Sequence, residues 1–149
     1  MDTTISRLDA RELRAWRGLL RVNDQISKAL DAELDAAHGL PLTSYEVLVY
    51  LSEADCCRMR MNDLADSVLL SRSGLTRLVD RLEREGYLER CSCPHDARGA
   101  FAVLTDAGRE KLDAARATHL ATVRRLFLSH FSPDELDRLG EAWDRLLSS

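Results

Sequence analysis

A long run of residues near the start of the chain carries the periodicity of a single α-helix. Apolar residues recur there at spacings of three, four or their sums: Leu13, Trp16, Leu20, Ile26, Leu30, Leu34 and Ala37. Gly39 and Pro41 end the run. At about 1.5 Å per residue the helix spans about 45 Å, which is longer than a small domain needs. Part of its apolar face must therefore pack on something outside a small fold.

A second, shorter helix is expected directly after this stop. The sequence Thr43-Ser-Tyr-Glu46 has the form of a capping box, in which a hydroxyl and a carboxylate satisfy backbone N–H groups at a helix start. The pattern predicts that this helix runs from Thr43 to about Glu53. A polar loop, residues 54–58, follows it.

Two further short helices are predicted between residues 62 and 86. Asn62 and Ser71 are suitable N-cap residues, and Gly86 suits a left-handed helix end. The apolar positions of the two helices are Leu64, Ala65, Val68, Leu75, Leu78, Val79 and Leu82. Because only a tight break at residues 69–70 separates these helices, they form a helix-turn-helix.

Two strands and two helices complete the predicted order of secondary-structure elements. Residues 87–93 and 100–104 read as strands joined by a turn rich in Pro, Asp and Gly, and the order leaves room for a short strand just before the third helix. Thr105 opens a long helix that ends near Phe131, and a capping box at Ser132 and Glu135 opens the last helix. The predicted fold is mainly α with a small β-wing: a winged helix-turn-helix with long N- and C-terminal helices.

Length and charge restrict the class of protein. The 149 residues and 45% hydrophobic content suit one domain with a real core. The net charge of −4 argues against a protein that coats nucleic acid or anionic membranes without specificity, so DNA binding must depend on a local arrangement of charge. No apolar run approaches the roughly 18 residues of a membrane span, and no signal peptide opens the chain. We therefore expect a cytoplasmic protein with no membrane partner.

The helix that starts at Ser71 carries a polar face suited to DNA. Its apolar stripe directs Arg72, Ser73, Thr76, Arg77 and Asp80 away from the body. The arginine, serine and threonine side chains can contact base edges and phosphates when the N-terminal half of such a helix enters a major groove. On this helix alone, an ordinary solvated face of a surface helix is the alternative.

The predicted turn between the strands adds a second group of candidates. Arg98 at the turn can enter a minor groove, whose negative potential attracts arginine. Asp96 can hold that side chain by a charge-assisted hydrogen bond. His95 and Arg90 are further candidates for phosphate contacts. Double-stranded DNA is thus the expected partner.

The motifs together resemble the MarR family of bacterial regulators. The run from Ser71 to Glu83, the sequence Gly86-Tyr-Leu-Glu-Arg90, the wing residues 94–98 and Leu104-Thr-Asp-Ala-Gly108 carry the resemblance, which extends over almost the whole chain. It implies one domain over residues 1–149, with dimerisation helices at 8–40 and 106–149 and a DNA-binding lobe at 43–104.

The resemblance also implies a mode of action. Family members commonly act as homodimers that repress transcription, and Leu136, Leu139 and Trp143 would be buried against a second subunit. By resemblance, Arg98 takes the wing role, Asp96 orients it, and Ser71 to Arg77 take the recognition-helix roles on a pseudo-palindromic operator. A small, aromatic or phenolic effector commonly releases the DNA, which requires that it bind the released state better.

The effector would lie between the dimerisation helices and the DNA-binding lobe. Trp16, Arg17, His38 and Tyr45 are the candidate lining residues. The alternative is that Trp16 and Tyr45 are ordinary core residues. The sequence does not name the ligand.

The cysteines leave a second kind of trigger open. Cys91 and Cys93 lie two apart on a predicted strand, hence on one face, with His95 close behind. Oxidation there, or a metal held with His95, would give a thiol-based or metal-responsive regulator. The spacing is not a recognised zinc pattern, so no metal site is predicted.

An enzyme is the contrasting class. The sequence has no Gly-rich phosphate loop and no nucleophile with an evident base and orienting group. We therefore predict neither catalysis nor a cofactor.

Overall fold

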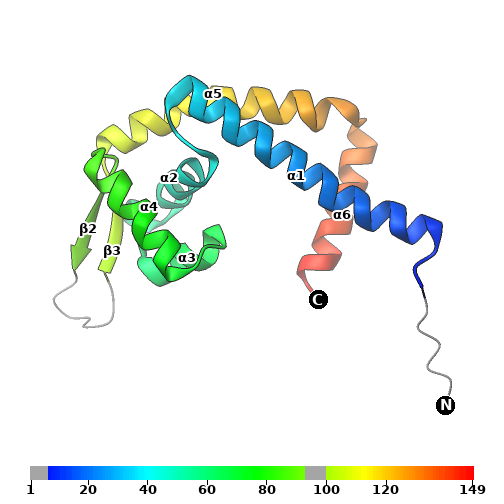
Figure 1. Cartoon of the computed structure of the whole chain (residues 1–149), viewed down its shortest axis with the longest axis horizontal. Coiled ribbons are helices and arrows are strands. Elements are labelled where there is room, and N and C mark those ends of the chain that lie inside the picture. Colours follow the sequence, from blue (N-terminus) through cyan, green and yellow to red (C-terminus); the bar gives the residue numbers. More distant parts are fainter. Residues whose placement is uncertain (1–6, 93–99) are drawn as a thin grey trace, which may run out of the picture. The chain divides into compact units, whose positions relative to one another are not determined.

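A computed structural model describes the fold of residues 7–92 and 100–149 (Figure 1). The chain divides into two compact units. We call Leu30–Thr122 the lobe, and we call residues 7–29 together with Val123–Ser149 the terminal unit. The lobe is larger than the segment 43–104 that the sequence assigns to DNA binding.

The long first helix is confirmed as α1 (Ala10–His38), which contributes residues to both units. Its start is fixed by Asp9 and Glu12. The backbone N–H of Asp9 donates to the Glu12 carboxylate, and the N–H of Glu12 donates to the Asp9 carboxylate, both at 2.8 Å. Two orphan N–H groups are thus satisfied at the helix start.

Helix α2 (Leu42–Glu53) exists as expected, but the capping box at its start was a wrong prediction. The helix begins at Leu42, one residue early, with Pro41 as the N-cap residue and no side-chain cap. An aspartate of α1 takes over the role, since Asp31 Oδ1 accepts a hydrogen bond from the Leu42 N–H at 2.9 Å. Thr43 therefore lies inside the helix.

The cap predicted at Asn62 was also wrong. A 3₁₀ turn, η1 (Asp55–Cys57), leads into a short strand, β1 (Arg58–Arg60), and α3 (Met61–Val68) starts directly after it. Because Arg60 pairs with Phe101 of a neighbouring strand, the backbone stays extended up to Arg60, which becomes the N-cap residue without a side-chain bond. The short strand that the sequence left open is therefore present.

The wing strands form a three-stranded antiparallel sheet in the order β1-β3-β2. Strand β2 (Leu88–Ser92) pairs with β3 (Ala100–Leu104), which also pairs with β1. In Figure 1 the β2 and β3 arrows run beside α4 (Arg72–Arg84). The mainly helical fold with a small β-wing is confirmed.

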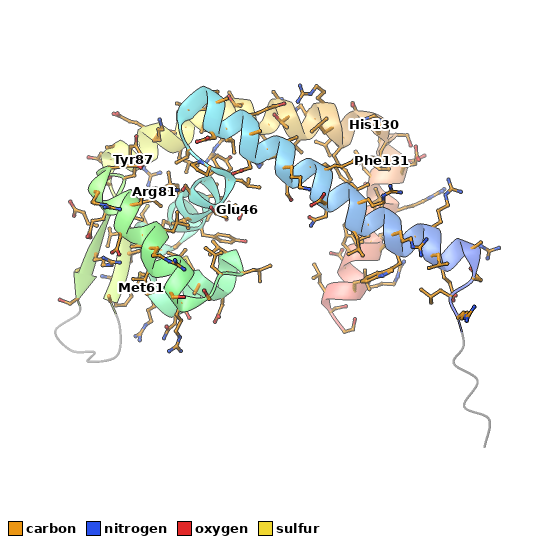
Figure 2. All side chains as sticks on the ribbon, viewed as in Figure 1. Glu46, Met61, Arg81, Tyr87, His130 and Phe131 are labelled. Atoms are coloured by element: carbon orange, nitrogen blue, oxygen red, sulfur yellow. The ribbon has the colours of Figure 1, made fainter. Side chains whose placement is uncertain are left out.

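The lobe has its own hydrophobic core. Helices α2, α3 and α4, the sheet and the adjoining parts of α1 and α5 (Asp106–Leu126) contribute to it. Its most deeply buried side chains include Leu34, Val47, Leu48, Leu51, Leu64, Leu75, Val79, Leu82, Leu88 and Leu112. Arg81, labelled in Figure 2, crosses from α4 to α2 and donates to the buried Ser44 hydroxyl at 2.7 Å.

The turn after α4 and the start of α5 meet at one junction. Gly86 has the left-handed conformation expected of it, with φ of 84°. The Thr105 hydroxyl donates to the Gly86 carbonyl at 2.6 Å and accepts from the Gly108 N–H at 3.0 Å. A Cβ at Gly108 would overlap the Tyr87 carbonyl oxygen, so this helix start can lie against the turn only with glycine there.

The terminal unit contains the first part of α1, the end of α5, a 3₁₀ turn η2 (Leu128–His130) and α6 (Pro133–Leu147). The capping box at Ser132 and Glu135 is confirmed, with Pro133 at the first helical position. Hydrogen bonds from the Ser132 backbone and hydroxyl lower the pKa of Glu135. In the described parts of the chain, none of the helices has the length and hydropathy needed to cross a bilayer.

Candidate nucleic-acid interface

Helix α4 presents the predicted polar face to solvent. Leu75, Leu78, Val79 and Leu82 are buried and fix the orientation of the helix on the lobe. Its N-terminal half then exposes the predicted contact residues, which are Ser71, Arg72, Ser73, Thr76 and Arg77. The structure therefore brings these five residues together on one accessible helix face.

The hydroxyl groups of this face are partly occupied by local bonds. Ser71 is the N-cap residue, as expected, and its hydroxyl accepts from the Gly74 N–H at 3.1 Å. Thr76 Oγ1 donates to the Arg72 carbonyl at 2.8 Å. Within the described residues, no hydrogen bond or ion pair engages the guanidinium groups of Arg72 and Arg77. These two side chains are therefore the charged donors of the face.

Arg90 differs from the other candidates because its guanidinium is bound within the lobe. It lies on β2, and Nη1 is 2.5 Å from Asp80 Oδ1 and 3.7 Å from Glu83 Oε1. Nη2 donates to the Thr76 carbonyl at 3.3 Å. All three partners lie on α4, so Arg90 links the root of the wing to this helix.

A pair of arginines on β1 extends the positive charge of the sheet. Arg58 and Arg60 are both exposed, and their guanidinium carbons lie 5.1 and 5.3 Å from the ring centroid of Phe101 on β3. The sequence analysis missed them because the strand is only three residues long. The available signal was the spacing of two between the arginines, which places both on one face of a strand.

The predicted wing-tip contacts cannot be placed in the same way. Cys93, His95, Asp96 and Arg98 lie outside the described residues, which stop at Ser92 and resume at Ala100. The roles of these residues therefore stay predictions.

The effector-pocket candidates are divided between the two units. Trp16 and Arg17 belong to the terminal unit, where Trp16 is 53% exposed. His38 and Tyr45 belong to the lobe. His38 Nε2 lies 2.8 Å from Thr118 Oγ1, and Tyr45 is buried and stacked on His119 with ring centroids 4.5 Å apart.

Burial affects both rings of this stack. It raises the pKa of Tyr45 and lowers the pKa of His119. Tyr45 thus occupies a core position, as the alternative interpretation expected, whereas the exposed Trp16 does not. Whether it also lines an effector site stays a prediction.

The described cysteines are all free thiols. Cys91 is exposed on β2, and Cys56 is exposed in η1. Cys57 Sγ lies 2.7 Å from a guanidinium nitrogen of Arg109 at the start of α5. Among the residues that the structure describes, no group of three His, Cys, Asp or Glu side chains is arranged to hold a metal ion.

The terminal unit contains an open apolar groove of about 800 Å³. Residues of α1, α5, η2 and α6 line it, among them Leu19, Val22, Val123, Phe127, Phe131, Leu139 and Trp143. Phe131 is labelled in Figure 2, and its ring lies 5.1 Å from that of Phe127. A large apolar surface of this kind marks an interaction site in soluble proteins.

Comparisons with known proteins agree with this arrangement. The profile of the MarR family matches residues 38–99. The uncharacterised HTH-type transcriptional regulator YkoM of Bacillus subtilis is 36% identical over 102 residues, which are 68% of this chain and 64% of that protein. The chain thus spans slightly less than two thirds of this relative.

Two solved structures match over nearly the full length. AbsC, a MarR family transcriptional regulator from Streptomyces coelicolor, is 37% identical with a TM-score of 0.88, and the match covers 96% of each chain. Sco3205, a MarR family regulator of the same organism solved in complex with DNA, is 34% identical with a TM-score of 0.88, over 95% of this chain and 89% of the other. These names denote transcriptional regulators rather than enzymes. The chain belongs to the MarR family of winged helix-turn-helix transcriptional regulators.

Proposed function

We propose that this chain is a DNA-binding regulator that inserts α4 into the major groove of an operator. The observation that carries the proposal is the exposed N-terminal half of α4, with Arg72 and Arg77 on a face that the buried stripe directs outward. Guanidinium groups can fork onto guanine edges or phosphates at such a position. Sco3205, which shares the fold and about a third of the sequence, was solved with DNA.

The other contact residues have complementary roles in this proposal. Ser71, Ser73 and Thr76 meet phosphates or base edges beside the two arginines. On the wing, Arg98 enters the minor groove, Asp96 orients it and His95 meets a phosphate. Because the net charge is negative, these few positions supply the attraction to DNA.

We further propose that the working form is a homodimer. Helix α6 has one apolar face, yet none of its residues is buried within the chain, and the groove beside it is open. A second copy covering these surfaces would place two α4 helices on half-sites about one helical turn apart. The length of α1 is then explained, since its surplus apolar surface is covered too.

Repression released by a small molecule completes the proposal. A cytoplasmic regulator blocks transcription while it occupies the operator, and an aromatic or phenolic anion that prefers the released state reverses the block. The exposure of Cys91 supports one alternative trigger, oxidation of a thiol on the wing. A variant with all four cysteines replaced by serine distinguishes the two, because a response that survives the change excludes thiol and thiolate–metal sensing.

The docking proposal is tested with duplex DNA from upstream of the chain's own gene, by measuring affinity at several salt concentrations. We expect Arg98→Ala to weaken binding to all sequences alike. It should also lower the salt slope, the steepness with which the logarithm of the binding constant falls with the logarithm of the salt concentration, by about one. Arg77→Ala should also relax the base preference. Arg84→Ala, at the other end of α4, is the matched control. Unchanged affinity in both test variants would rule out this docking.

A further inference from the structure

The register of the wing sheet shows which way Arg90 points. Residues directly opposite one another in antiparallel strands lie on the same face of the sheet. Arg90 pairs with Ala102, which pairs in turn with Met59, and Ala102 is fully buried. Its neighbour Cys91 is paired with Phe101 and lies on the outer face with Arg60. Arg90 is therefore directed inward, toward α4.

The backbone of Arg90 is held by α4 as well. Strand β2 is an edge strand, so its outward-facing N–H groups have no strand partner. Glu83 Oε2 accepts the Arg90 N–H at 2.8 Å, while Oε1 of the same carboxylate lies 3.7 Å from Nη1. One glutamate thus binds both the main chain and the side chain of the residue opposite it.

The remaining contacts fix the guanidinium in place and balance its charge. Asp80 binds Nη1, and the Thr76 carbonyl accepts from Nη2. Asp80 and Glu83 are spaced by three on α4 and so lie on neighbouring positions of one helix face. The Arg90 side chain is 30% exposed and Asp80 46%, so water weakens each ion pair, but four contacts converge on one residue.

This network connects α4 with the wing. In the proposed function α4 enters the major groove and the wing enters the minor groove. We infer that Arg90 is a positioning residue for DNA binding, which sets the root of the wing against the recognition helix through Asp80 and Glu83. The inference rests on the proposed function. In this role Asp80 increases the affinity for the operator by holding Arg90, although its negative charge is on the helix that faces DNA.

A direct phosphate contact by Arg90 makes opposite predictions. If Arg90 bound phosphate, removing Asp80 would free its charge for DNA and leave binding equal or tighter. If Arg90 positions the wing, removing either partner misplaces one DNA-contacting element relative to the other. Both substitutions then weaken binding, by roughly 2- to 30-fold, the range found for residues that couple sites without touching the ligand.

The experiment measures binding to the duplex that the wild-type chain selects from a random-sequence pool. Arg90→Met and Asp80→Ala should each lower the affinity, and the double variant should be no weaker than the weaker single variant. The salt slope should be the same for Arg90→Met and Asp80→Ala, because both variants misplace the wing and neither removes a phosphate contact of its own. Arg90→Lys should also bind weakly, since an ammonium group cannot form the forked contacts.

Matched controls separate positioning from charge and from folding. Asp66→Ala removes an exposed acid of α3 and should leave affinity equal or increase it, whereas Arg84→Met removes one positive charge of α4 outside the network. Thermal unfolding of each variant shows whether the lobe is folded at the assay temperature. If Arg90→Met is unfolded there, the affinity of Arg90→Lys takes its place in the comparison.

The results that overturn the inference are distinct from those that overturn the proposed function. Wild-type or tighter binding by Asp80→Ala overturns the positioning role, as does a salt slope that is lower by about one in Arg90→Met than in Asp80→Ala. If the wild-type chain selects no duplex at all, the proposed function itself fails.

Discussion

Helices α4 and α6 are built alike but differ in what they bury. Each begins with a serine whose hydroxyl caps the helix, and each has one apolar and one polar face. The apolar face of α4 is buried in the core of the lobe through four side chains. The apolar face of α6 buries none of its residues within the chain, and Leu146 and Leu147 are 64% and 86% exposed.

The contrast shows which helix is stabilised by contacts within its own chain. Helical propensity and a cap alone give only marginal stability to a helix of this length. The lobe supplies α4 with packing partners, whereas α6 would gain comparable burial only from the second copy proposed above. Mutations in the two helices should therefore differ in how their effects depend on protein concentration.

The largest effect is expected in the core of the lobe. Leu82→Ala removes a fully buried side chain of α4 and should lower the free energy of unfolding by about 2–5 kcal/mol, through lost burial and the cavity left behind. Chemical denaturation, followed through the unfolding transition of the lobe, measures this loss. Because the partners of Leu82 are in the same chain, the loss should be the same at low and high protein concentration.

Leu147→Ala is the control with the same chemical change on α6. Its side chain is largely exposed, so its loss should be well below that of Leu82→Ala. If the two variants lost equal stability, the difference between the helices would not be one of burial.

A smaller effect, and one that depends on concentration, is expected on α6. Trp143 lines the apolar groove of the terminal unit and is 37% exposed in the single chain. Trp143→Ala should raise the dissociation constant of the proposed dimer by about 10- to 30-fold, equivalent to about 1.4–2 kcal/mol, as for an aromatic anchor in an interface. Sedimentation over a range of concentrations measures it.

The polar face of the same helix provides the control for this measurement. Glu141 lies between Leu139 and Trp143 in sequence but is directed to the other side of the helix, and it is exposed. Glu141→Ala should leave the dissociation constant nearly unchanged. A Trp143→Ala chain that stays as dimeric as the wild type would mean that another surface joins the copies.

Sequence periodicity predicted α4 and α6 well because the information is local. The apolar stripe of α4, the caps at Ser71 and Ser132 and the left-handed Gly86 all depend on residues within one or two helical turns. The exposed face of α4 follows from the stripe, so most of the candidate interface could be named before the structure.

The wrong caps, and the contacts of Arg90 that the sequence did not indicate, occur where a distant segment determines the local structure. The start of α2 is satisfied by Asp31 of α1, and the start of α3 follows from the pairing of β1 with β3. The inward direction of Arg90 depends on the register of an edge strand and on carboxylates of α4. None of these partners is adjacent in sequence, so the candidate phosphate contact could not be distinguished from a structural link.

The smallest effect is a pH dependence that should originate in the lobe. His119 stacks on Tyr45, and its Nδ1 is buried without a hydrogen-bond partner among the described residues. Burial lowers the pKa of His119 below its usual value of 6.5, so near that pH the folded chain binds fewer protons than the unfolded chain. The stability from neutral His119 is therefore fully present above about pH 6.5 and is lost as the pH falls.

Denaturation between pH 7 and 5 tests this dependence. One histidine contributes a slope of at most about 1.4 kcal/mol per pH unit. His119→Phe keeps a ring against Tyr45 and removes the titrating group, so its stability should fall less steeply with acid than that of the wild type. His130→Gln, at an exposed position of the terminal unit, should retain the wild-type slope. Equal slopes in the wild type and His119→Phe would show that the acid sensitivity has another source than His119.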